Sequence, residues 1–125
     1  MFLADTNIFL EILLKRDKKE RCKKFLDDNI INLSMTDFSL HSIGVILFRY
    51  GKVDVFLKFA EDVALNVKLL SLPIESYREV VSASKSFNLD FDDAYHYAIA
   101  KHYGLKIVTM DEDYKRMKDI EVSFL

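Results

Sequence analysis

The stretch MFLADTNIFLEILL, residues 1–14, decides the fold of this chain. Residues 2–4 predict a short buried strand, and the apolar residues at helical spacing that come after it predict a helix. Asp5, Thr6 and Asn7 occupy the junction between the two elements. Because ligands collect at the carboxyl edge of open α/β sheets, the stretch predicts such a sheet with polar residues at its functional edge.

The composition predicts one domain with its own hydrophobic core. Half of the 125 residues are hydrophobic, and 10 Phe and 6 Tyr supply bulky side chains. With only 3 Gly and 1 Pro, the loops must be short, which favours helices and closely connected strands over an all-β design. Cys22 is the only cysteine, and no apolar run approaches the roughly 18 residues that span a bilayer. We therefore expect a cytoplasmic protein that does not enter a membrane.

The charged residues are unevenly distributed along the chain. The net charge of −2 does not by itself indicate a nucleic-acid binder. Seven basic residues nevertheless gather between positions 15 and 24, and aspartates concentrate between positions 90 and 113. The basic run favours a solvent-facing helix surface, and the alternative is a flank that contacts phosphates beside an acidic, metal-loaded site.

The rest of the chain alternates predicted strands with predicted helices. Thr36 is placed to cap the start of a helix, and Gly51 to end it. Further strands are expected over 30–35, 67–72, 105–109 and 120–125, and further helices over 18–28, 53–65, 75–87, 90–103 and 111–117. This alternation predicts a single domain, residues 1–125, with a central parallel sheet in a three-layer α/β/α sandwich. The strand order does not follow from the pattern.

Three aspartates are expected at the same edge of this sheet. Asp5 follows the first strand, Asp111 follows the strand expected over 105–109, and Asp93 lies near the start of a helix. Clustered carboxylates repel one another unless hard divalent cations neutralise them, and Mg²⁺ prefers such oxygen ligands. A pair of ions can support phosphodiester cleavage by water. Each aspartate alone is also consistent with a helix cap or a partner for the helix dipole.

Three segments carry a resemblance to a known family: LADTN at 3–7, LDFDDAY at 89–95 and IVTMDEDY at 107–114. Their order and spacing resemble those of PIN domains, the small nuclease fold of VapC-type toxins in toxin–antitoxin pairs. The resemblance implies a central parallel sheet between helices and a ribonuclease site that depends on Mg²⁺ or Mn²⁺. It also implies an RNA substrate, an antitoxin partner and a homodimer.

The resemblance assigns roles to individual residues of this chain. It implies that Asp5, Asp93 and Asp111 are the acids of the metal site. It further implies that Thr6, Asn7 and Thr109 shape the pocket, with Asp92 and Asp113 as supporting acids; Asp93 matches the family pattern better than its neighbour Asp92.

The chain departs from the family at one position. PIN domains usually carry another acid, commonly Glu, on the helix after the second strand, where this chain has His41 or Ser42. Asp37 at the start of that helix is the available substitute. One hypothesis is that Asp37 completes the acidic cluster, and the other is that it is only a helix-start aspartate. His41 is consistent with a phosphate contact or with a structural histidine.

Three functions remain open on the sequence. The first is a divalent-metal-dependent endoribonuclease, with Asp5, Asp93 and Asp111 holding the metal and Asp37 assisting. The second is a catalytically weak PIN-like module that binds RNA or protein. The third is a receiver-like phosphoacceptor at Asp5. Walker, dinucleotide-binding and serine-hydrolase motifs are absent from the sequence, which removes the main support for those classes.

Overall fold

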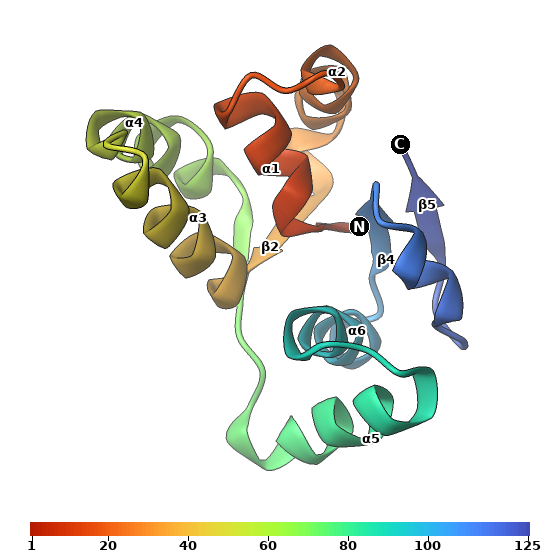
Figure 1. Cartoon of the computed structure of the whole chain (residues 1–125). Helices are drawn as coiled ribbons and strands as arrows, with labels where there is room; N and C mark the ends of the chain where they lie inside the picture. The colour runs from red at the N-terminus through yellow and green to blue at the C-terminus, as the bar shows by residue number, and fades with distance from the viewer.

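The computed structural model describes residues 1–125 as a five-stranded parallel sheet with helices on both faces (Figure 1). The strands follow the order β3-β2-β1-β4-β5 across the sheet. Their bounds are β1 Phe2–Ala4, β2 Leu33–Thr36, β3 Lys68–Leu70, β4 Lys106–Thr109 and β5 Val122–Phe124. The predicted α/β/α architecture is therefore confirmed.

Six α-helices connect the strands. They are α1 Thr6–Leu13, α2 Lys19–Asn29, α3 Asp37–Arg49, α4 Val53–Asp62, α5 Tyr77–Phe87 and α6 Phe91–Tyr103. Four short 3₁₀ helices fill the remaining connections: η1 Ile30–Asn32, η2 Ala64–Asn66, η3 Ile74–Ser76 and η4 Glu112–Arg116. None of the helices has the length and the apolar character needed to cross a membrane.

The elements expected from the sequence are present, with shifted ends. The strand expected over 30–35 begins as the 3₁₀ helix η1, and the helix expected over 111–117 is the 3₁₀ helix η4. The capping role of Thr36 is confirmed, because its hydroxyl oxygen accepts a hydrogen bond from the Ser39 N–H at 2.9 Å.

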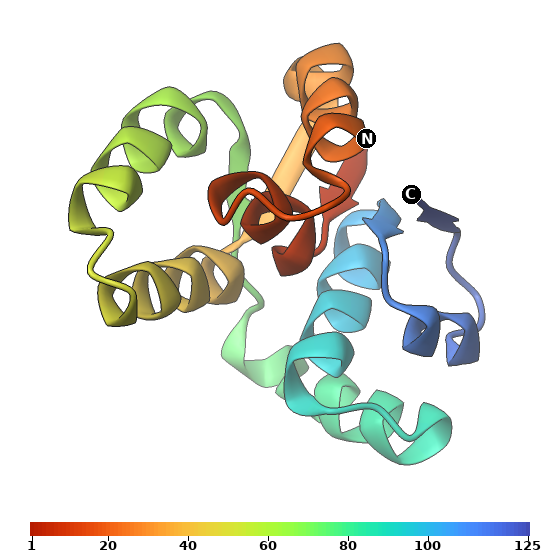
Figure 2. The same cartoon turned by 45° about the horizontal axis from the view of Figure 1, so that its top comes forward.

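Successive residues of the strands face two separate hydrophobic cores. Leu3 and Ile107 pack against α5 and α6, whereas Ala4 and Val108 pack with the helices α1 to α4. Figures 1 and 2 show these two groups of helices on opposite sides of the sheet. Because side chains alternate along a strand, the residue that follows Ala4 points back toward the α6 side.

The strand order places a topological switch point between β1 and β4. From β1 the chain builds outward through β2 to β3, and then returns to add β4 and β5 on the other side of β1. Ala4 pairs with Val108 in the register between these two strands, and the Asp5 N–H donates to the Val108 carbonyl at 2.9 Å. In open α/β sheets, the crevice at such a point is where ligands bind.

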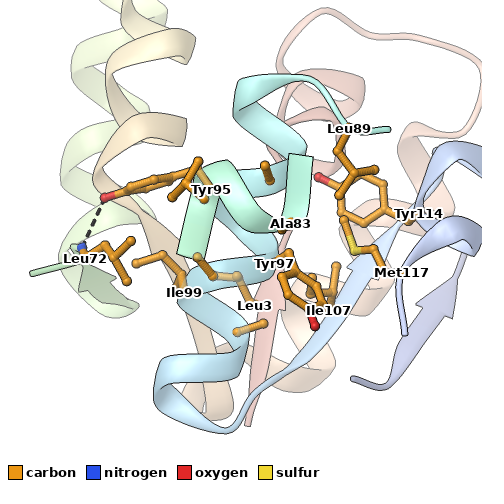
Figure 3. Packing of buried hydrophobic residues seen from close by; sticks show 14 of the residues in the cluster. Leu3, Leu72, Ala83, Leu89, Tyr95, Tyr97, Ile99, Ile107, Tyr114 and Met117 are labelled. Carbon is orange, nitrogen blue, oxygen red and sulfur yellow. Dashed lines mark hydrogen bonds between the residues drawn. The ribbon is translucent and has the colours of Figure 1, made fainter. Parts of the chain in front are cut away.

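Tyr95 of α6 joins three parts of the structure. Its hydroxyl donates to Oδ1 of Asp37 at 2.8 Å and accepts from the Leu72 N–H at 3.1 Å, the bond drawn in Figure 3. The side chain is buried, and burial is the main cause of a raised pKa, so the phenol keeps its proton. This contact holds the start of α3 and the segment after β3 against α6.

We expect Tyr95→Phe to lower the free energy of unfolding by about 1–3 kcal/mol, because it leaves the buried Leu72 N–H without a partner. Tyr103→Phe is the matched control, since the Tyr103 hydroxyl donates to the Ser71 carbonyl in an exposed position. We expect the control to change stability by less than about 0.5 kcal/mol. Urea denaturation measures both values, and equal losses would contradict the role given to Tyr95.

Candidate functional site

An acidic pocket of about 280 Å³ lies at the switch point of the sheet. Six of the residues that line it are aspartates: Asp5, Asp90, Asp92, Asp93, Asp111 and Asp113. The other lining residues are Thr6, Asn7, Leu10, Phe38, Ser42 and Ile46. A water molecule occupies about 30 Å³ in the liquid, so the pocket has room for a cation with several waters.

Three of the aspartates are close enough to share one cation. Carboxylate oxygens of Asp93, Asp111 and Asp113 lie within 4.8 Å of one another. Asp93 belongs to the first turn of α6, and Asp111 caps η4 by accepting from the Asp113 N–H at 2.9 Å. Asp93 is buried, Asp111 is half-buried and Asp113 is exposed. The three carboxylates therefore form a set that is open to solvent on one side.

The pocket carries a large uncompensated negative charge. Burial, reinforced by the charge of Asp92, raises the pKa of Asp93 to about 7. Among lysines and arginines, only Arg116 pairs with an aspartate of the pocket, with Nη2 3.3 Å from Oδ1 of Asp113. Such a cluster favours a bound cation, because a cation offsets both the burial and the like charges that otherwise retain a proton on Asp93.

Asp5 lies in the same pocket but is held differently. The Thr109 hydroxyl donates to its Oδ2 at 2.7 Å, and the Tyr114 hydroxyl donates to its Oδ1 at 3.2 Å. The Thr109 oxygen in turn accepts from the Asp111 N–H at 3.0 Å. Each oxygen of the Asp5 carboxylate therefore has a protein donor, and the orientation of Asp5 is fixed by β4 and η4.

A buried histidine continues this network below the pocket. His96 of α6 is 1% exposed, with Nδ1 3.1 Å from the Tyr114 hydroxyl and Nε2 2.9 Å from Oγ of Ser39. Burial lowers the pKa of His96, although the nearby Asp5 acts in the opposite direction. Burial, followed by the charge of Asp5, raises the pKa of Tyr114, so the phenol remains a hydrogen-bond donor.

The structure brings together most of the residues predicted from the sequence. The predicted acids Asp5, Asp93 and Asp111 line one pocket with the supporting residues Thr6, Asn7, Asp92 and Asp113. Thr109 is fully buried behind Asp5. The sequence suggested Asp5 as the third member of the metal-site group with Asp93 and Asp111. In the structure, the carboxylate that lies close to those two is that of Asp113.

Besides Thr109, two predicted residues do not line the pocket. Asp37 does not line it, and its Oδ1 accepts from the Phe38 N–H and from the Tyr95 hydroxyl. His41 is exposed and lies along a neighbouring groove. Ser42 is the polar residue of α3 that lines the pocket. The acid of the family pattern is expected at the position of either His41 or Ser42.

Sequence reasoning missed three polar residues around Asp5, namely Ser39, His96 and Tyr114. His96 follows Asp93 by three residues on the same helix, a spacing that places both side chains on one face. Tyr114 follows Asp111 by three residues within the motif that suggested the family. These spacings were available in the sequence, whereas the approach of Ser39 to His96 depends on the packing of α3 near α6.

The seven basic residues between positions 15 and 24 are all exposed, and none lines the aspartate pocket. Glu11, just before this segment, is buried and accepts from the Lys18 N–H at 2.8 Å. This bond closes the connection between α1 and α2, so Glu11 has a structural role.

A family model of the PIN domain matches residues 2–120. The chain belongs to the PIN domain family. The pocket at the switch point, with aspartates contributed by the segments after β1 and β4 and by the start of α6, is thus the acidic pocket of a PIN domain. A search of curated protein sequences finds no match.

Solved PIN proteins of toxin–antitoxin systems share the fold at low sequence identity. VapC20 of Mycobacterium tuberculosis, described as a sarcin–ricin loop cleaving toxin, is 14% identical, with a TM-score of 0.82 over 98% of this chain and 99% of that chain. VapBC2 of Rickettsia felis, bound to a promoter DNA fragment, is 11% identical, with a TM-score of 0.82 over 99% and 98%. A toxin–antitoxin complex of Klebsiella pneumoniae is 16% identical, with a TM-score of 0.79 over 96% and 95%.

We expect the metal-free protein to lose stability as the pH rises from 6.5 to 8. The pKa of Asp93 in the folded state, about 7, lies above its ordinary value of 3.8, so the folded state binds more protons than the unfolded state across this window. The contribution of Asp93 to stability is therefore present at low pH and is lost as the pH rises through 7. The ordinary pKa of histidine lies at the lower edge of this window, where the lowered pKa of buried His96 acts in the opposite direction, so the decline is clearest between pH 7 and 8.

Thermal unfolding in the presence of a chelator measures this effect. Asp93→Asn should flatten the decline and raise the Tm at pH 8 by a few degrees, because it removes the repelled charge. Asp27→Asn, at an exposed position outside the pocket, should keep the wild-type decline. An Asp93→Asn protein that retains the full decline would contradict the electrostatic account.

Proposed function

We propose that this PIN domain is a divalent-metal-dependent endoribonuclease and the toxin of a toxin–antitoxin pair. The observation that carries the proposal is the group of carboxylate oxygens from Asp93, Asp111 and Asp113 within 4.8 Å of one another at the switch point. Only oxygen donors are present in this group, which suits Mg²⁺ or Mn²⁺ and gives no support to zinc.

In the proposed site Asp93, Asp111 and Asp113 hold the cation, and Asp5 faces it from the end of β1. When bound, the divalent ion supplies an activated water and charge stabilisation for phosphodiester hydrolysis. Thr109 and Tyr114 keep the Asp5 carboxylate in one orientation. Leu10, Phe38 and Ile46 form the apolar part of the pocket wall.

The RNA substrate and the antitoxin partner are proposed from the family and from the structural neighbours. VapC20 is described as a toxin that cleaves the sarcin–ricin loop, and several neighbours were solved as toxin–antitoxin complexes. The exposed basic run before and within α2 is a candidate contact for RNA phosphates outside the pocket. An RNA strand would then cross a surface with separate acidic and basic regions.

A second candidate function is a PIN module that binds RNA or a protein without efficient turnover. The observation that favours it is Ser42, which gives α3 a neutral residue at the pocket where the family pattern has an acid. Both functions predict RNA binding, so turnover with a divalent ion is the property that separates them.

We expect purified protein to cleave RNA with Mg²⁺ or Mn²⁺ and to be inactive with a chelator. Asp93→Asn and Asp111→Asn should each lower the cleavage rate by at least about 100-fold, because each removes a group that acts on charge at the reacting centre. Gel analysis of a structured RNA measures the rates.

Asp27→Asn is the control for this experiment, because Asp27 is an exposed aspartate remote from the pocket. It should cleave at the wild-type rate. Cleavage that persists in both Asp93→Asn and Asp111→Asn would overturn the proposed site. Tight Mn²⁺ binding by the wild type without any cleavage would favour the binding module.

We expect Asp37→Asn to bind Mn²⁺ with wild-type affinity, because the Asp37 carboxylate bonds to Tyr95 and does not line the pocket. Its free energy of unfolding should fall, since the bond from Tyr95 weakens. The free Mn²⁺ signal in electron paramagnetic resonance measures the affinity. A loss of affinity as large as that of Asp93→Asn would instead place Asp37 among the metal-site acids.

A further inference from the structure

A chain of hydrogen-bonded side chains runs beneath the acidic pocket and ends on Asp5. It joins elements on both sides of the sheet through His96, which is fully buried. Its members, in order, are Thr36, Ser39, His96, Tyr114 and Asp5, with Thr6 as a side branch on Ser39. All the members except Thr6 are buried.

Asp5 fixes the direction of the bonds at its end of the chain. Carboxylates only accept hydrogen bonds, and the Tyr114 hydroxyl faces two of them: Oδ1 of Asp5, 3.2 Å away, and the carboxyl of Asp93. Its single proton therefore goes to this carboxylate side and not to His96. The contact of 3.1 Å between the Tyr114 oxygen and Nδ1 of His96 must then have the histidine as donor. The geometry therefore requires a proton on Nδ1.

The other end of the chain agrees with this direction. A neutral imidazole with Nδ1–H has an acceptor at Nε2, and Ser39 can donate its hydroxyl proton there across 2.9 Å. The Ser39 oxygen then accepts from Thr36 at 3.1 Å and from Thr6 at 2.7 Å. Every hydroxyl in the chain thus gives its proton in the direction of Asp5.

The opposite tautomer would interrupt the chain of hydrogen bonds. With the proton on Nε2, Nδ1 would have a hydrogen-bond partner only if the Tyr114 hydroxyl donated to it. The phenolic oxygen would then face the Asp5 oxygen without a proton between them. A buried carboxylate oxygen that loses its donor costs about 1–3 kcal/mol or more. The structure contains no such conflict in the Nδ1–H form.

We propose that His96, as the Nδ1–H tautomer, is a positioning residue that acts through Tyr114 to orient Asp5 toward the divalent-cation site. Its consequence for cation binding rests on the proposed function. Asp93 lies three residues before His96 on α6, so one helix face carries both a cation ligand and the donor that orients the opposite acid. The chain of hydrogen bonds therefore sets the position of Asp5 relative to Asp93.

The tautomer is tested on the wild-type protein by nitrogen-15 nuclear magnetic resonance of the metal-free form. The couplings of the ring nitrogens to the carbon-bound protons identify which nitrogen of His96 is protonated. We expect Nδ1–H. A proton found on Nε2 would overturn the hydrogen-bond chain, and this measurement needs no variant.

The positioning role is tested with two substitutions that each keep one side of the ring. The amide nitrogen of Asn occupies the place of Nδ1, so His96→Asn keeps a donor for Tyr114. His96→Gln places its amide near Nε2 and loses that donor. We expect His96→Gln to lower the Mn²⁺ affinity about tenfold, the scale found when the groups around a metal site lose their orienting partners, and His96→Asn to recover most of it.

Two further variants serve as a control and as an independent check for this comparison. His102→Gln makes the same change at an exposed histidine of the same helix and should bind Mn²⁺ as the wild type does. Tyr114→Phe removes only the bridging oxygen and should match His96→Gln, so the test survives if one histidine variant does not fold. Equal Mn²⁺ affinity in His96→Gln, Tyr114→Phe and the wild type would overturn the positioning role.

The outcomes also separate this inference from the proposed function. A wild-type protein with the Nδ1–H tautomer that binds no divalent ion would overturn the metal site but leave the chain of hydrogen bonds intact. A protein that binds Mn²⁺ and cleaves RNA, but carries the proton on Nε2, would overturn only the role of His96.

Discussion

Electrostatic repulsion among carboxylates is the constraint on which the rest of this structure depends. Six aspartates line one small pocket, and only Arg116 among the lysines and arginines pairs with any of them. The fold offsets part of this repulsion, because α1, α3 and α6 all begin at this edge of the sheet. Helix N-termini carry partial positive charge, so their convergence favours anions there. The raised pKa of Asp93 reflects its burial first and the remaining repulsion second.

The hydrogen bonds divide the aspartates into two kinds. Asp5 receives a donor on each oxygen and belongs to the rigid interior. Asp93, Asp111 and Asp113 have closely spaced oxygens and become progressively more exposed. Because two donors fix the orientation of the Asp5 carboxylate, it does not need to reorient when a ligand binds. Acids at the open side can exchange protons, waters and a cation, and this division suits a site that must bind and release.

The sequence predicted the strands, the helices and the edge on which the acids meet, because these depend on local patterns. Asp5, Asp93 and Asp111 share a pocket as a direct consequence of strands that are parallel. The strand order that puts β1 beside β4 depends on packing across the whole sheet and could not be predicted locally. The same limit applies to Asp37. Its position at a helix start was consistent both with a member of the acidic cluster and with a simple helix-start aspartate. Its bond to Tyr95, which is 58 residues away in the chain, exists only in the folded structure.

The use of Asp37 as a packing partner makes the pocket electrostatically asymmetric. The α3 side presents Phe38, Ser42 and Ile46, which carry no charge, while the aspartates belong to the segments around β1, α6 and η4. A polyanion such as RNA is repelled by uncompensated carboxylates and meets least resistance along the neutral side. With a cation held by Asp93, Asp111 and Asp113 in the proposed site, a phosphate that approaches along α3 would have the cation in front of it and the uncharged side chains of α3 beside it. The neutral wall that departs from the family pattern thus favours one direction of approach.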